Sequence, residues 1–190
     1  MTRLLHLGCG QKGHAFPTPD VEEITLDADA SNKPDIVCCL GRDTIPLPDD
    51  SIDGALAVHV LEHIGRVGET SEWFQFWEEL YRVLKPEGKL EFVAPWWESV
   101  WAWADPSHVR PLSPEAFYFL RQANYLIPDA PISPYHIRCD FVPSGPIIKI
   151  AGAVPAIIEA PSMNASAPTI AFRGTLIAQK PLQPWWEHSS

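Results

Sequence analysis

The stretch LHLGCGQKGHAF, residues 5–16, joins a short apolar run to three glycines. Gly8, Gly10 and Gly13 match G-x-G-x-x-G, a turn that brings the backbone close to a nucleotide after the first strand of a parallel sheet. In dinucleotide-binding proteins a helix follows the third glycine and directs its N-terminus at a pyrophosphate. The residues after Gly13 therefore decide which nucleotide this turn holds.

The segment after the glycines is poorly suited to such a helix. Only eight residues separate Gly13 from the next apolar run, and Pro17 and Pro19 lie among them. Asp27 ends that run, 19 positions after Gly8, where a carboxylate accepts hydrogen bonds from ribose hydroxyls. A glycine turn with a ribose-binding acid and no pyrophosphate helix favours a nucleoside without phosphates, S-adenosylmethionine, over NAD.

The apolar runs predict a parallel sheet. Five short segments rich in β-formers are expected to be strands: 4–7, 22–27, 35–40, 54–60 and 89–94. Strands with few polar residues, joined by helices, indicate a parallel sheet covered on both faces. Two later segments, 136–142 and 169–179, are expected to pair antiparallel at a sheet edge.

Two helices are expected. Residues 71–85 place apolar side chains on one face, with Thr70 or Ser71 as the cap and Pro86 with Gly88 as the end. A second helix is predicted from Ser113, followed by proline at the first helical position, to about residue 123.

Composition limits the class of protein. The 190 residues are 46% hydrophobic and 20% charged, which predicts one globular domain over residues 1–182 and a tail over 183–190. The net charge of −10, with no basic patch, disfavours a nucleic-acid partner. No secretory signal and no apolar run of about 18 residues are read, so a cytoplasmic protein is expected and no membrane partner. The four cysteines lack C-x-x-C spacing and are expected to be free thiols.

At this point the chain resembles a known family. LHLGCG, ITLDAD, KPDIVCCLG, IPLPDDSIDGALAVHVLEHI and ELYRVLKPEGKLEFVAPW occur in order over about residues 3–120. They are similar to the successive motifs of class I S-adenosylmethionine-dependent methyltransferases, in a small bacterial and phage-type branch with a shortened first helix. The resemblance implies a Rossmann-like α/β fold, a doubly wound and mostly parallel seven-stranded sheet whose last strand is antiparallel.

The resemblance also implies a cofactor site. The residues carried over to it are Gly8, Cys9, Gly10, Asp27, Ala28, Cys39, Leu40 and His59. The glycine turn would wrap the methionine part, and Asp27 with Ala28 would hold the ribose. Cys39 and Leu40 stand where the family often has an acidic residue for the adenine amino group, for which Asp43 is an alternative. His59 would line the cofactor and acceptor sites.

The segment after the fifth strand, residues 95–112, is expected to carry the acceptor. The residues proposed to bind it are Trp97, Asp105, His108 and Arg110, with a structural role for the last three as the alternative. If the acceptor must lose a proton, His59 or His108 is the base. His59 and His63 lie four apart, but the glutamate of H-E-x-x-H is missing, so no metal site is predicted.

Together these features predict a methyltransferase that acts on an O or N atom of a small-molecule, sugar or peptide acceptor. Two alternatives stay open: an NAD(P)-dependent oxidoreductase, and a non-catalytic protein that keeps the methyltransferase fold as a scaffold.

Overall fold

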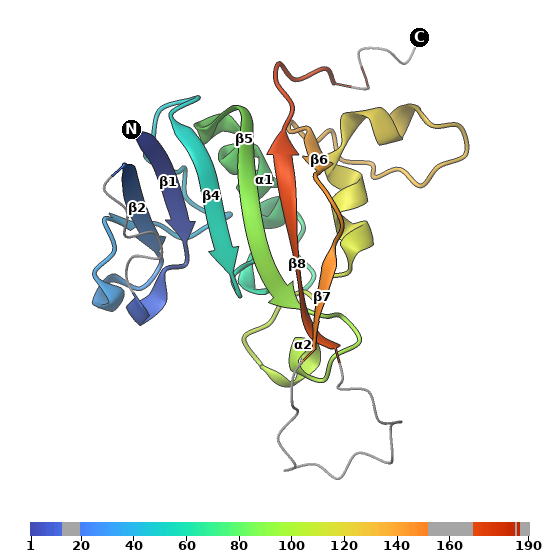
Figure 1. Cartoon of the computed structure of the whole chain (residues 1–190). Helices are drawn as coiled ribbons and strands as arrows, with labels where there is room; N and C mark the ends of the chain where they lie inside the picture. The colour runs from blue at the N-terminus through green and yellow to red at the C-terminus, as the bar shows by residue number, and fades with distance from the viewer. Residues whose placement is uncertain (13–19, 152–168, 185, 187–190) are drawn as a thin grey trace.

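The computed structural model of the chain describes residues 1–12, 20–151, 169–184 and 186. Its strands form one eight-stranded sheet (Figure 1). Seven strands follow one another across it in the order β3-β2-β1-β4-β5-β8-β6, and β7 pairs with β8 off this path. The predicted Rossmann-like α/β fold with an antiparallel last strand is confirmed, with one strand more than the seven expected.

The first half of the sheet is parallel. Its strands are β1 (Thr2–Leu7), β2 (Val21–Asp27), β3 (Ile36–Val37), β4 (Ile52–Val58) and β5 (Leu84–Pro95). Leu7 lies beside Leu26 on one side and beside Ala57 on the other, so β1, β2 and β4 end at the same level. The predicted strand 35–40 is shortened because Cys39 starts a turn, in which its carbonyl accepts from the N–H groups of Arg42 and Asp43.

Helix α1 (Ser71–Val83) confirms the first predicted helix. Trp73, Trp77 and Leu80 share one face and are buried against the sheet. The expected Thr70 or Ser71 cap is wrong in detail, because the Glu69 carboxylate accepts from the Ser71 N–H at 2.7 Å instead. The helix ends before the predicted Pro86 because β5 begins directly at its C-terminus and pairs with β4.

The second predicted helix is wrong in type. The segment forms two 3-10 turns, η4 (Pro114–Leu120) and η5 (Gln122–Leu126). With three residues per turn, Phe117 and Leu120 lie on one side of η4, and both are buried. Extended backbone at Arg121 separates the two turns.

The predicted antiparallel pairing is confirmed, but the first of its two strands is shorter than predicted, with residues 136–140 outside any strand. Strand β8 (Thr169–Ala178) lies between β5 and β6 (Phe141–Pro143) and also pairs with β7 (Ile148–Ala151). All three pairings of β8 are antiparallel.

The sheet is not covered by α-helices on both faces in the described part of the chain. Helix α1 packs behind the sheet in Figure 1, whereas α2 (Trp101–Ala104) lies at the end of β5. The expectation of helices on both faces is wrong here. Between β2 and β3 the chain has no room for a crossover helix, because residues 28–35 are fewer than the dozen or so that such a connection needs. On β5, Leu90 and Phe92 face the core while Lys89 and Glu91 are exposed.

None of the helices that the structure describes could cross a bilayer.

Candidate functional site

The carboxyl ends of β1, β2 and β4 form one edge of the sheet. From β1 the chain crosses to β2 on one side, while β4 pairs on the other, so the strand order reverses between β1 and β4. In open α/β sheets this is where ligands bind. Gly8, Asp27 and His59 are the residues at or just beyond the ends of these three strands.

The turn after β1 requires glycine at its first position. Gly8 has φ +58°, and a Cβ there would lie 2.5 Å from Cγ2 of Val60, which is closer than side chains approach. Gly10 has φ +55°, and a Cβ there would meet no atom of the described residues within 4 Å. Among these residues, the turn therefore packs against the segment after β4 at Gly8 but not at Gly10. Gly13 and the two prolines expected to break a helix lie outside the described residues.

Asp27 is held rigidly at the end of β2. One carboxylate oxygen accepts the Gly10 N–H at 2.8 Å and the other accepts the Asp29 N–H at 2.8 Å. Each oxygen keeps a further lone pair, so the carboxylate can still accept from a pair of vicinal hydroxyls. The exposed Ala28 follows it directly. These residues fit the ribose of a nucleoside, and η1 (Gly10–Lys12), of three residues, is too short to direct a helix dipole at phosphates.

Cys9 contributes to the turn through its backbone. Its N–H donates to the Leu26 carbonyl at 3.1 Å, and its side chain is buried. Burial, followed by the nearby Asp27 charge, raises the pKa of the Cys9 thiol. The side chain therefore lies in the core as a neutral thiol.

The segment after β3 presents a partly open surface. Cys39 and Leu40 are half-buried, and the Cys39 N–H donates to the Asp43 carboxylate at 2.7 Å. Asp43 thus stabilises the turn that follows β3, whatever else its second oxygen binds. Cys38 is buried, and its N–H donates to the Asp27 carbonyl.

His59 lies one residue past β4 and is open to solvent. Its backbone has φ +54°, which is uncommon outside glycine, and its side chain is 53% exposed. Its Nδ1 lies 3.2 Å from Oε1 of Glu62, whose side chain is only 2% exposed. A buried carboxylate fixes the imidazole at the edge where β1 and β4 diverge. Sequence reasoning missed this partner, although the spacing of three residues in HVLE was the signal for it.

The loop of residues 95–112 starts beside His59, because the His59 N–H donates to the Val93 carbonyl on β5 at 2.8 Å. Trp96 is buried and packs edge-on against Phe172. Three other tryptophans of the loop, with exposed fractions of 40–66%, are Trp97, Trp101 and Trp103. The Trp103 indole N–H donates to the Trp97 carbonyl at 2.8 Å, which closes the loop around α2.

Of the predicted group of Asp105, His108 and Arg110, the structure brings together only the first two, with Oδ2 of Asp105 3.8 Å from Nε2 of His108. Asp105 accepts from the N–H and hydroxyl of Ser107, and these bonds hold the pKa of its carboxyl below the usual range. Arg110 turns away, stacks 4.5 Å over the Trp73 ring and donates to the Glu69 carbonyl. Among the described residues no ion pair joins Asp105 to Arg110, so the expected anchoring pair is wrong.

Burial lowers the pKa of Arg110, which binds the loop to α1 and does not face open space. His108 is instead next to His63, with ring centroids 4.8 Å apart. Of the three residues that the sequence grouped for acceptor binding, Asp105 and His108 therefore lie together, and Arg110 lies apart from them.

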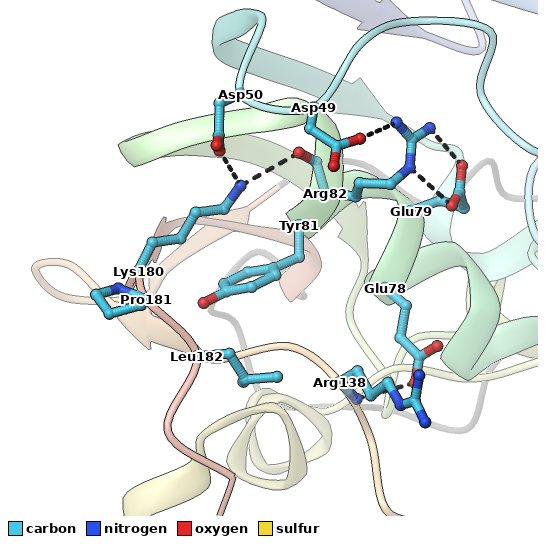
Figure 2. Close-up of a pocket in the computed structure, with 10 residues that line it drawn as sticks. All are labelled: Asp49, Asp50, Glu78, Glu79, Tyr81, Arg82, Arg138, Lys180, Pro181 and Leu182. Atoms are coloured by element: carbon cyan, nitrogen blue, oxygen red, sulfur yellow. Dashed lines mark hydrogen bonds and ion pairs between the residues drawn. The ribbon is translucent and has the colours of Figure 1, made fainter.

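A hollow at the end of the sheet opposite the candidate site is lined by ion pairs that hold the fold together (Figure 2). Arg82 lies between Asp49 and Glu79, at 2.8 and 2.7 Å, and Lys180 pairs with Asp50. Strand β4, of seven residues, separates this edge from His59, a distance of roughly 23 Å at 3.3 Å per residue. Its charges neutralise each other and attach the segment after β8 to α1.

The comparisons with known proteins agree with this geometry. The methyltransferase domain family matches residues 5–92. The matched residues include the glycine turn, Asp27 and His59, and the fold of the whole chain is that of S-adenosylmethionine-dependent methyltransferases. The match favours S-adenosylmethionine over NAD(P) as the cofactor. No curated protein matches the chain significantly.

Three solved structures, two of them described as methyltransferases, share the fold. A SAM-dependent methyltransferase from Archaeoglobus fulgidus is 18% identical, with 94% of this chain and 86% of that chain covered and a TM-score of 0.58. The N-methyltransferase NodS from Bradyrhizobium japonicum is 11% identical, with 94% and 86% covered and a TM-score of 0.59. The YcgJ protein from Bacillus subtilis is 18% identical, with 93% and 89% covered and a TM-score of 0.54.

Proposed function

We propose that this methyltransferase acts on an O or N atom of a small molecule, sugar or peptide held against the aromatic loop of residues 95–112. One observation carries the proposal. Trp97, Trp101 and Trp103 are exposed on a loop that begins beside His59, at the edge of the sheet where the glycine turn and Asp27 lie. Exposed tryptophans grouped next to a cofactor edge suit a planar or sugar-like acceptor.

The cofactor site is proposed to use the glycine turn and three strand ends. Asp27, fixed by two backbone N–H groups, would accept the ribose hydroxyls, with Ala28 beside it. The backbone of residues 8–10 would surround the methionine part, and the half-buried Cys39 and Leu40 would contact the adenine. When bound, S-adenosylmethionine supplies the methyl group and a neutral thioether as the leaving group.

The protein contributes mainly by positioning. His59 is open to solvent on one side and fixed by Glu62 on the other, so its outer face can orient an acceptor hydroxyl or amine through a hydrogen bond. The acceptor's lone pair forms the new bond to carbon, the bond from carbon to sulfur breaks, and the acceptor proton leaves to water. His108 does not take part as a base in this proposal, because its ring is 9% exposed and lies against His63.

Steady-state kinetics with a panel of phenols, amines, sugars and short peptides tests the proposal, with S-adenosylhomocysteine as the product detected. For the best acceptor we expect Trp101→Ser and Trp103→Ser to raise KM at least several-fold without changing the Kd for S-adenosylmethionine. Ile132→Ser, at an exposed apolar side chain outside the loop, is the control and leaves both constants unchanged. Turnover on RNA or DNA and on none of the panel would overturn the proposal.

A further inference from the structure

Three side chains converge beside the proposed methyl-transfer site, and one of them, Glu62, also orients His59. Glu62 and His63 come from η3 (Leu61–His63), the turn after β4, and His108 comes from the loop of residues 95–112. One potential ligand atom from each lies within 4.8 Å of the other two. The same two segments are also joined through their backbones, since the Val109 N–H donates to the Glu62 carbonyl at 2.9 Å.

Both imidazoles are oriented by backbone carbonyls. Nδ1 of His63 lies 3.1 Å from the Ser107 carbonyl oxygen, and Nδ1 of His108 lies 3.3 Å from that of Ala102. A carbonyl oxygen can only accept, so these contacts require the proton on Nδ1. In the neutral ring this leaves a lone pair on Nε2. Histidines that bind metals in proteins commonly donate their other N–H to a carbonyl or carboxylate in this way.

Glu62, the third member of the cluster, has a hydrogen-bond partner for only one of its two carboxylate oxygens among the described residues. Its side chain is 2% exposed, and Oε1 lies 3.2 Å from Nδ1 of His59. Oε2 is buried and has no hydrogen-bond partner among the described residues. A buried carboxylate oxygen without a donor or cation destabilises the folded state, because it has lost its hydration without gaining a partner. A cation at the two imidazoles would remove that destabilisation.

We propose that Glu62, His63 and His108 bind one divalent transition-metal ion, a site that lies beside the methyl-transfer site and is independent of the acceptor. Two imidazoles and one carboxylate suit Zn²⁺ or Fe²⁺ better than Mg²⁺ or Ca²⁺, which prefer oxygen ligands. Ligand atoms around a four-coordinate Zn²⁺ lie roughly 3.3 Å apart, given bonds of about 2.0–2.1 Å. His63 is exposed, so it can move the short distance that the contraction requires.

The ion would fasten the acceptor loop to the end of β4. His108 is in the loop and the other two ligands follow β4, so one ion joins segments more than 40 residues apart in sequence. Oδ2 of Asp105, 3.8 Å from Nε2 of His108, is available for a fourth position, which solvent fills otherwise. The missing H-E-x-x-H motif argued only against a metal site formed by His59 and His63. In the structure His63 lies next to His108 instead.

Metal binding by the purified full chain, first dialysed against a chelator, tests this inference without any methyl acceptor. Titration with Zn²⁺ in a calorimeter is expected to show one site, and Zn²⁺ is expected to raise the melting temperature. His63→Ala is the main variant, because an exposed side chain can be removed with little effect on folding. It is expected to weaken binding about 100-fold or more and to abolish the thermal shift. Glu62→Gln and His108→Ala are expected to do the same where they fold.

His136→Ala, at an exposed histidine outside the cluster, is the matched control and keeps both the affinity and the shift. Substitution of Co²⁺ adds a spectroscopic readout: weak visible bands without thiolate charge-transfer absorption are expected for nitrogen and oxygen ligands. Equal Zn²⁺ affinity in the wild type and in His63→Ala overturns the proposal. Thiolate absorption would also overturn it, because the ion would then be held by cysteines.

Discussion

The contact between the glycine turn and the end of β4 allows a quantitative test at Gly8. Gly8→Ala adds a Cβ that would lie 2.5 Å from Cγ2 of Val60, in a backbone conformation with φ +58°. The left-handed backbone costs about 1–2 kcal/mol for alanine. The overpacking adds about 1–3 kcal/mol, because a buried and β-branched Val60 has little freedom to move.

Gly10→Ala is a matched control in the same turn. It has nearly the same backbone, φ +55°, but its Cβ would meet no atom within 4 Å in the part of the chain that the structure describes. It therefore carries the backbone cost alone, and the two variants are expected to differ by about 1–3 kcal/mol in the free energy of unfolding. For a chain of this size that is a difference of roughly 2–12 °C in melting temperature.

Urea denaturation of the two variants, with Val60→Ala and the double variant of residues 8 and 60, measures these terms. Shortening Val60 gives the new Cβ room, so the double variant is expected to be more stable than the sum of the single changes predicts, by about 1–3 kcal/mol. Equal losses for Gly8→Ala and Gly10→Ala, or strict additivity with Val60→Ala, would refute the steric reasoning.

Two further predictions concern titratable groups. Burial raises the pKa of Cys38 to about 11, and Cys9 and Cys139 are also buried, so a thiol reagent is expected to modify Cys39 first. Cys39→Ser should remove the fast phase of this modification. S-adenosylhomocysteine should slow the same phase if Cys39 contacts the adenine. The Asp53 carboxylate accepts hydrogen bonds from the Arg3 N–H and from Lys85, and these bonds hold the pKa of Asp53 below the usual range. The contribution of Asp53 to the stability of the fold is therefore present above about pH 4. It is lost as the pH falls through the lower folded-state pKa. Urea midpoints of Asp53→Asn and wild type should therefore converge in acid, and a gap that is constant with pH would contradict this.

Local sequence patterns predicted most of the sheet. Strands β1, β2, β4 and β5 each contain a short run rich in apolar residues, and Asp27 stands at the end of β2 as its distance from Gly8 indicated. Such features depend on residues close together in the chain and on the period of the side chains. The type of the turn at Pro114–Leu120 was missed because a proline start and an apolar face suit α and 3-10 geometry alike.

The environment of His108 could not be predicted from the sequence. Its neighbours Glu62 and His63 are more than 40 positions away, and their approach depends on how the loop after β5 folds back over η3. The pairing of Arg110 with the Trp73 ring is likewise a long-range contact, which spacing within D-P-S-H-V-R does not reveal.

The position of β8 has a consequence for how the chain folds during synthesis. This strand, Thr169–Ala178, lies between β5 and β6, so the sheet stays open along β5 until residue 178 has left the ribosome. Until then the unpaired edge of β5 can recruit a strand from another chain. Pairings over such long sequence separations are also slow to form. We therefore expect nascent chains that end before β8 to depend on chaperones, and the protection of β5 amides from hydrogen exchange to appear only once β8 is in place.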